Sequence, residues 1–153
     1  MGTICFQRVI MRNRSAAPRP ISKGDYEALA GFRYALRHFL HFSQSAARAA
    51  GLTPQQHQAL LAIKANPVRD EVTVGELADH LLLGHHSVVE LVNRLARLGL
   101  VHRKAHPSDG RRVLVALTAK AEQMLARLST AHLDEIHRLE PAMAALLERF
   151  GEG

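Results

Sequence analysis

Two short helices joined by a tight turn, followed at once by two strand-like segments, are the feature that most constrains how this chain folds. Thr73 opens a capping box with Glu76, which predicts that the first of these helices begins there. Gly84 interrupts it, and apolar residues at helical spacing predict a second helix from about His86 to Leu98. Two helices connected in this way are typical of a helix-turn-helix.

The strand-like segments lie directly after the second helix. Residues 100–104 and 113–117 favour strands, and the second segment is rich in β-branched and aliphatic side chains. Residues 106–111 between them have the composition of a turn, so the two segments predict a hairpin. A helix-turn-helix that continues into a hairpin is a winged helix. The expected fold class is therefore mainly α with a small β-hairpin wing.

Longer amphipathic helices are expected on both sides of this unit. Ser22 is predicted to cap a helix that ends at Gly51. A shorter helix is expected to follow, because Thr53, Pro54 and Gln56 form a start signal and Pro67 is expected to end it after about Asn66. After the hairpin, Thr118 is predicted to cap a helix that ends before Pro141, and a last short helix is expected from Pro141 to Phe150. The apolar stripes of these helices exceed what a small winged helix can cover, which favours a symmetric dimer.

These patterns divide the chain into two parts. We expect residues 1–21 to be a disordered basic arm, because they contain prolines and arginines without a sustained apolar period. Residues 22–150 are expected to form one domain. Within it, residues 53–117 form the winged helix, and residues 22–50 and 119–150 form the dimerisation helices.

The net charge of +6 is concentrated in two segments. Residues 1–21 contain four arginines and no acidic residue, and residues 84–112 contain six basic residues against Glu90 and Asp109. Basic charge gathered in this way is what binding to a phosphate backbone requires. A basic tail on a soluble protein is the simpler alternative.

The remaining composition excludes several classes of protein. Cys5 is the only cysteine, so the chain forms no internal disulfide and no four-thiolate zinc site, and it suits a reducing, cytoplasmic location. No apolar run is long enough to span a membrane, and no signal peptide is recognisable. Signatures of enzymes are missing, so no catalytic residue is predicted. Met1 and Met11 are both possible translation starts.

Five ordered blocks of the sequence resemble the MarR family of bacterial transcriptional regulators, over roughly residues 24–150. The blocks are Leu52–Leu61, Val72–Ala78, Leu95–Val101, Ser108–Arg112 and Leu117–Thr118. The resemblance implies an obligate homodimer of winged helices, dimerised through the first and last helices, that binds pseudo-palindromic double-stranded DNA. It also implies a repressor that is released by a small, often aromatic, ligand.

The second helix of the helix-turn-helix is expected to enter the major groove. His86 and Ser87 lie in its first turn, and a serine hydroxyl can bond several base edges. Val89 can contact a thymine methyl group, and Arg94 can bind a phosphate or a guanine. Glu90 departs from the residue type expected in the family. It either accepts from a cytosine amino group or pairs with Arg94 four residues on.

The predicted wing contains a second set of candidate DNA contacts. Asp109 and Arg111 match the family's Asp-x-Arg pattern, in which the arginine enters the minor groove and the aspartate orients it. A narrow minor groove favours an inserted guanidinium group because its negative potential is high. Arg112 adds a further positive charge. The alternative is an ordinary hairpin turn in which Asp109 and Gly110 only shape the backbone.

A ligand pocket is expected between the long helices and the winged helix, where the family binds its effectors. Its candidate lining residues are Tyr34, His38, Phe39, His41, Phe42 and His57. Aromatic and histidine side chains together suit an aromatic carboxylate or a phenol. Plain core packing is the alternative for each of them.

Three alternative functions remain open: a metal-responsive regulator, a redox-responsive regulator and a binding protein that does not recognise specific DNA. His38 with His41, and His85 with His86, invite a metal-responsive regulator, but their spacing supplies no set of three or four ligands, so no metal or cofactor is predicted. Cys5 invites a redox-responsive version, although it lies in the basic arm. The third alternative is a winged-helix ligand-binding or scaffold protein without specific DNA recognition.

Overall fold

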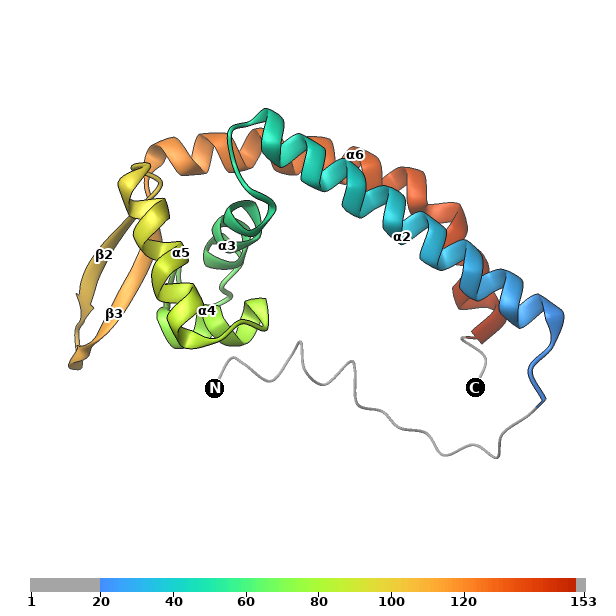
Figure 1. The fold of residues 1–153 in the computed structure, drawn as a ribbon, viewed down its shortest axis with the longest axis horizontal. Helices are drawn as coiled ribbons and strands as arrows, with labels where there is room; N and C mark the ends of the chain where they lie inside the picture. Colours follow the sequence, from blue (N-terminus) through green and yellow to red (C-terminus); the bar gives the residue numbers. More distant parts are fainter. Residues whose placement is uncertain (1–19, 151–153) are drawn as a thin grey trace.

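The computed structural model describes residues 20–150. Its longest elements are helices α2 (Lys23–Ala49) and α6 (Ala119–Phe150), which lie side by side and run in opposite directions (Figure 1). The other elements gather near the end of α2 and the beginning of α6 (Figure 1). The molecule therefore has a mixed α/β part at one end and a pair of helices that extends from it.

A hydrogen bond of 2.8 Å between His132 Nε2 and Ser43 Oγ joins the two long helices. Beyond this bond, residues 23–42 of α2 and 133–150 of α6 extend away from the remaining elements (Figure 1). We call these two segments the helical arm. Elsewhere α6 packs on the end of the winged helix through Ala121, which is fully buried.

Three of the predicted helix starts are confirmed, and each of the three has a local capping box. Ser22 accepts from the backbone N–H of Asp25, whose carboxylate accepts from the N–H of Ser22 in return. The same reciprocal pair forms at Thr53 before α3 (Pro54–Lys64) and at Thr73 before α4 (Val74–Leu81). Each box satisfies N–H groups that a helix start leaves without partners.

The turn between α4 and α5 (His85–Arg97) differs from the expectation that glycine shapes it. Leu82, and not Gly84, adopts the left-handed conformation, with φ 55°. Gly84 has φ −66° and serves as the N-cap of α5. A left-handed leucine costs roughly 1–2 kcal/mol, so the packing of the two helices outweighs this local strain.

The sheet has three antiparallel strands in the order β1-β3-β2. The hairpin of β2 (Val101–His106) and β3 (Asp109–Leu117) was predicted, although its strands are longer and its turn shorter than expected. Strand β1 (Glu71–Thr73) was not predicted. It pairs with β3, with Thr73 opposite Leu114. Three residues directly before a helix cap are too few to produce an alternating pattern.

The expected break at Pro141 is wrong. Helix α6 continues through this proline to its end. Proline removes one backbone N–H and disturbs the preceding turn, which normally ends or kinks a helix. Here the residues after it, Ala142 and Leu146, line a groove shared with Gly24 and Ala28 of α2. Contact with α2 thus supports the helix on both sides of the proline.

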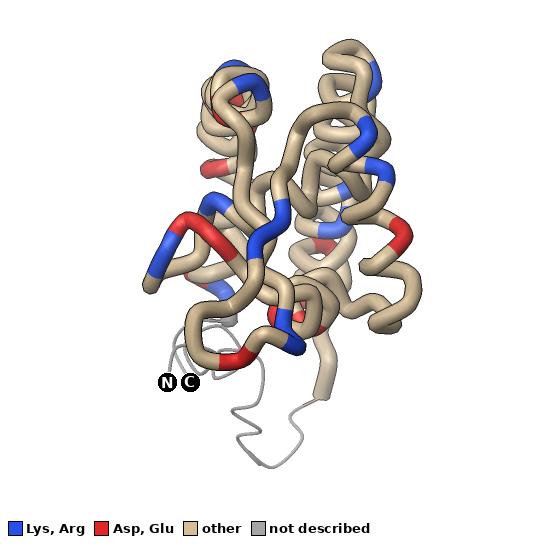
Figure 2. The backbone as a smooth tube through the Cα atoms, turned by 90° about the vertical axis from the view of Figure 1, so that its left-hand side faces the viewer, with Lys and Arg blue, Asp and Glu red and all other residues tan. Residues whose placement is uncertain are grey.

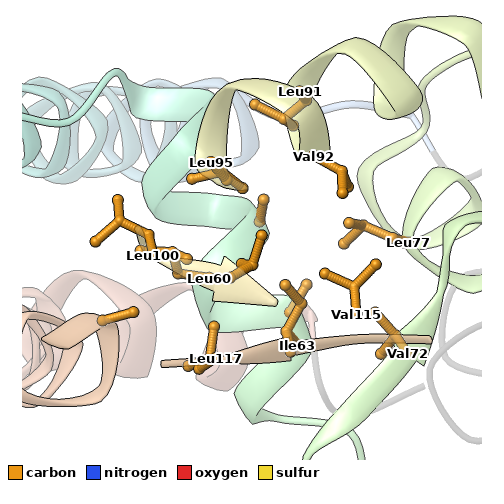
Figure 3. Packing of buried hydrophobic residues seen from close by; sticks show 14 of the residues in the cluster. Leu60, Ile63, Val72, Leu77, Leu91, Val92, Leu95, Leu100, Val115 and Leu117 are labelled. Carbon is orange, nitrogen blue, oxygen red and sulfur yellow. The ribbon is translucent and has the colours of Figure 1, made fainter. Parts of the chain in front are cut away.

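The hydrophobic core lies inside the winged helix, between α3, α4, α5, the sheet and the start of α6 (Figure 3). Leu60 and Ile63 of α3 pack at its centre, together with Leu95 of α5 and Val115 of β3. All four side chains are fully buried. This core fixes α5 against the sheet and so determines which of its faces remains exposed.

Candidate nucleic-acid interface

Helix α5 has one apolar face and one polar face. Val88, Leu91, Val92 and Leu95 are buried in the core of the winged helix. These four residues recur at the three- and four-residue spacing that places side chains on one side of a helix. Their burial leaves the opposite face of α5 directed outward.

The outer face of α5 contains the side chains predicted to contact DNA. His86, Ser87, Glu90 and Arg94 are exposed, and Val89 is half-buried. The Arg94 guanidinium reaches back along the helix, where Nε donates to the backbone carbonyl oxygen of Glu90 at 3.3 Å. A salt bridge between these side chains was one expected role of Glu90. In the structure, the backbone oxygen takes the place of the carboxylate as acceptor.

The predicted Asp-x-Arg pattern lies at the tip of the wing, at the start of β3. Oδ1 of Asp109 accepts a hydrogen bond of 3.1 Å from the backbone N–H of Arg111. We expected this carboxylate to orient the guanidinium group, but in the structure it orients the backbone amide. This geometry is that of an Asx turn, which shapes the tip of the hairpin. The side chains of Arg111 and Arg112 are exposed.

A groove of about 380 Å³ separates α5 from the wing. Its ionisable and polar lining residues are Thr73, His85, Asn93, Arg103, Arg111 and Arg112. Figure 2 views the molecule from the wing and shows basic positions recurring along the nearest segments, with acidic positions among them. The structure thus brings Val89 of the predicted helix contacts together with Arg111 and Arg112 of the predicted wing contacts around one groove.

Sequence reasoning missed Arg103 as a residue of this site. Its Nη1 donates to Oδ1 of Asn93 at 2.6 Å, which links strand β2 to helix α5. A signal was present in the sequence: Arg103 lies two residues after the buried Val101, and side chains two apart on a strand share a face. That face is the one that α5 covers.

Acidic residues behind the wing keep several basic side chains in ion pairs. Arg69 lies 3.7 Å from Glu76, and Lys104 pairs with Glu71. Burial would raise the pKa of Glu76, but hydrogen bonds from Thr73 and the nearby positive charges outweigh it and lower that pKa below its ordinary value. Glu76 therefore stays ionised near neutral pH.

The six residues predicted to line an effector pocket separate into two groups. Phe39, Phe42 and His57 surround the ring of His132, a residue that sequence reasoning did not single out. The other three, Tyr34, His38 and His41, are exposed on α2. Tyr34 and His38 contact each other, with ring centroids 4.4 Å apart.

His132 connects α2, α3 and α6 at the base of the helical arm. Its Nδ1 lies 2.6 Å from the carbonyl oxygen of Leu128, which can only accept, so Nδ1 carries a proton. In the neutral ring, Nε2 then accepts from the Ser43 hydroxyl. The ring of His57 lies 4.7 Å away. Burial, together with the charge of His132, lowers the pKa of His57.

Three other predictions concern metal binding, membrane spans and redox chemistry. In the part of the chain that the structure describes, no three His, Cys, Asp or Glu side chains are arranged to hold a metal ion. No helix of residues 20–150 combines the length and the apolar character that crossing a bilayer requires. Cys5 and most of the predicted basic arm lie outside the described residues.

Residues 50–112 match the sequence profile of the MarR family. Over these residues, which make up less than half of the chain, the protein is similar to the MarR family. The match spans the helix-turn-helix, β2 and the tip of the wing, and so includes every predicted DNA-contact residue.

Curated proteins are also similar to part of this chain. YcgE of Bacillus subtilis (strain 168), described as an uncharacterized HTH-type transcriptional regulator, is 40% identical over 85 residues, which are 54% of this chain and 53% of that protein. This chain spans about half the length of the curated relatives it matches.

Solved structures share the fold of this chain. AbsC of Streptomyces coelicolor, a MarR family transcriptional regulator, superimposes with a TM-score of 0.64 at 18% identity, covering 79% of this chain and 81% of that one. Sco3205 of the same organism, solved in complex with DNA, gives a TM-score of 0.62 at 22% identity, covering 88% and 81%.

Proposed function

We propose that this protein is a transcriptional regulator that binds double-stranded DNA sequence-specifically as a homodimer. One observation carries the proposal: Val89 of α5 and the exposed Arg111 and Arg112 of the wing line the same groove, next to the exposed face of α5. Winged helices bind DNA with one helix in the major groove and with an arginine of the wing in the adjacent minor groove. Sco3205, which has a similar fold, was solved in complex with DNA, and this supports DNA as the partner.

In this proposal, α5 lies in the major groove. Its first turn would be closest to the base edges, where Ser87 donates or accepts and His86 lies beside it. Val89 would contact a thymine methyl group. Arg94 would bind a phosphate or a guanine. Glu90 is exposed, and we assign it to the amino group of a cytosine, because Arg94 bonds its backbone oxygen and not its carboxylate.

The wing would supply the minor-groove contact. Arg111 inserts its guanidinium group, and Arg112 neutralises a flanking phosphate. Asp109 acts on the backbone, because its hydrogen bond to the Arg111 amide fixes the shape of the tip. A fixed tip lowers the entropy that Arg111 loses when DNA binds.

Dimerisation would use the two long helices. Large apolar side chains are exposed along them: Tyr26, Leu29, Tyr34, Leu36, Leu40, Leu133, Ile136, Met143 and Leu147. Apolar side chains in such number on one pair of helices mark an interface. A two-fold dimer would place two copies of α5 on half-sites about one helical turn, roughly 34–36 Å, apart. Bound there, the dimer would block transcription, and it would act in the cytoplasm.

We further propose that a small aromatic ligand releases the DNA. Phe39, Phe42 and His57 support this role, because they gather where the helical arm meets the winged helix. A ligand there would change the angle between these parts and so the separation of the two recognition helices. Isothermal titration against a panel of aromatic acids and phenols tests this step. Failure of the whole panel to bind would contradict it.

Selection of bound DNA from a random pool tests the main proposal. A pseudo-palindromic consensus is expected. Arg111→Ala should then weaken binding to the selected DNA by about 1–3 kcal/mol in a mobility-shift titration. Arg127→Ala on the exposed surface of α6 is the matched control and should leave the affinity unchanged. Equal affinity for selected and random duplexes would refute sequence-specific regulation.

A further inference from the structure

The sheet narrows from three strands to two at one point along the wing. Strand β1 pairs with residues 114–116 of β3, and Thr73 opposite Leu114 is the last of these pairs. Lys104 of β2 lies opposite Leu114 on the other side of β3. Residues 105–113 therefore project as a two-stranded hairpin, which is only marginally stable by itself. We call Arg103 and Lys104 the wing root.

Arg103 lies on the inner face of the sheet. It pairs with Val115, which is fully buried in the core, so both side chains are directed toward the helices. The 2.6 Å hydrogen bond from Arg103 to the Asn93 side chain therefore ties this level of the wing to α5. Asn93 uses its amide oxygen in this bond and is half-buried, which leaves it poorly placed to read a base.

Lys104 lies on the outer face, because successive strand residues point to opposite sides. It reaches across β3 to form an ion pair with Glu71, whose side chain is largely buried. The wing root is thus held on its inner face by α5 and on its outer face by β1. Beyond it, the ladder is irregular between Ala105 and His106, so the tip has few other constraints.

We propose that Arg103 is a positioning residue that determines DNA specificity by fixing the wing relative to α5 through Asn93. The inference rests on the proposed function. Arg111 can enter the minor groove at the correct distance from the bases read by α5 only if the wing leaves the sheet at a fixed angle. Loss of the Arg103–Asn93 bond would let the tip move, so matched and unmatched DNA would bind more equally. Arg103 itself contacts no base and no phosphate.

The test compares Arg103→Gln, Asn93→Ala and the double variant on two duplexes, the selected DNA and a random sequence, over a series of salt concentrations. Each single variant should lose about tenfold in the ratio of specific to random affinity. The double variant should lose no more than either single one, because both remove the same bond. The slope of log affinity against log salt should stay at the wild-type value.

Arg112→Ala provides the contrasting result, because removing a residue that neutralises a phosphate lowers the slope of log affinity against log salt by about 0.9. If Arg103→Gln shows the same lowered slope with an unchanged specificity ratio, Arg103 is a phosphate contact and the proposal is wrong. Additive losses in the double variant would also overturn it. Circular dichroism and thermal unfolding verify that each variant is folded.

A measurement without DNA separates this inference from the proposed function. Spin labels are attached through Ser87→Cys on α5 and Ser108→Cys at the wing tip, in a Cys5→Ser background and diluted with unlabelled protein. The distribution of distances between the two labels should be narrow in this background and broader after Arg103→Gln. Equal widths would refute the positioning role even if the protein binds DNA specifically. If wild-type protein shows no preference between duplexes, the proposed function fails while the distance measurement still tests the wing root.

Discussion

The winged helix and the helical arm use their apolar residues in opposite ways. In the winged helix, Leu60 and Leu95 are fully buried within a single chain. In the described part of the helical arm, only Asp25 and Ala35 are buried. Leu133, by contrast, is 57% exposed. The difference indicates that the winged helix is stabilised by its own core. The helical arm needs contact with another surface to bury its apolar side chains.

Truncation of the core should have the largest effect. Leu60→Ala removes a side chain that is 0% exposed, which should lower the free energy of unfolding by about 2–5 kcal/mol. The neighbouring Leu61 on the same helix is 44% exposed, and Leu61→Ala is the matched control with an expected loss below about 1 kcal/mol. Urea denaturation followed by circular dichroism measures both. Equal losses of unfolding free energy in the two variants would mean that the buried core does not stabilise the winged helix.

A charge on the helical arm should act on assembly and not on the fold. Ile136 is 47% exposed on α6, and Ile136→Glu should weaken the proposed dimer at least tenfold, about 1.4 kcal/mol, because a carboxylate would be buried in an apolar interface. Sedimentation velocity over a range of protein concentrations measures the change. Arg138→Glu alters charge two residues further on, at a position outside the apolar stripe, and serves as the control. A dimer that tolerates Ile136→Glu would place the interface elsewhere.

Features set by neighbouring residues could be predicted from the sequence, and features set by distant contacts could not. The three capping boxes involve residues three apart, so Ser22, Thr53 and Thr73 marked their helices correctly. Strand β1 depends on pairing with β3, and the continuity of α6 through Pro141 depends on α2. The sequence around β1 and around Pro141 does not indicate that β3 or α2 packs there.

The candidate site shows the same division. The outward face of α5 followed from its helical period, and the placement of Asp109 and Arg111 followed from the hairpin turn. The bond from Arg103 to Asn93 joins a strand to a helix ten residues away. His132 binds Ser43 across 89 positions of sequence. Spacing along the strand indicates the face on which Arg103 lies, but the partner in each of these pairs depends on how the elements pack.

An ion pair with one buried partner, Asp25, should hold the far end of the helical arm together. The carboxylate of Asp25, which is 1% exposed, accepts from Arg149 Nε at 3.0 Å, and so joins the start of α2 to the end of α6. Asp25→Asn should destabilise this end by about 1–3 kcal/mol, because the buried pair loses its negative charge. Hydrogen exchange should increase in the first turns of α2 and the last turns of α6 only. Glu148→Gln next to Arg149 is the control, and faster exchange throughout the winged helix would show that the two regions are not separable.

The junction of the two regions should respond to pH, with the smallest effect of the four. Burial lowers the pKa of His57 below its ordinary value of 6.5, so the unfolded chain binds more protons than the folded one below that pH. Stability contributed by neutral His57 is therefore fully present above about pH 6.5 and is lost as the pH falls through the lowered value. His132 is the titratable group that faces it, and the rings of Phe39 and Phe42 of α2 close the cluster. The unfolding temperature measured from pH 8 to pH 5 should fall less steeply in His57→Gln than in wild type, while His137→Gln on the exposed side of α6 should follow the wild type. If the unfolding temperature falls equally steeply with pH in all three proteins, protonation of His57 does not cause the loss of stability.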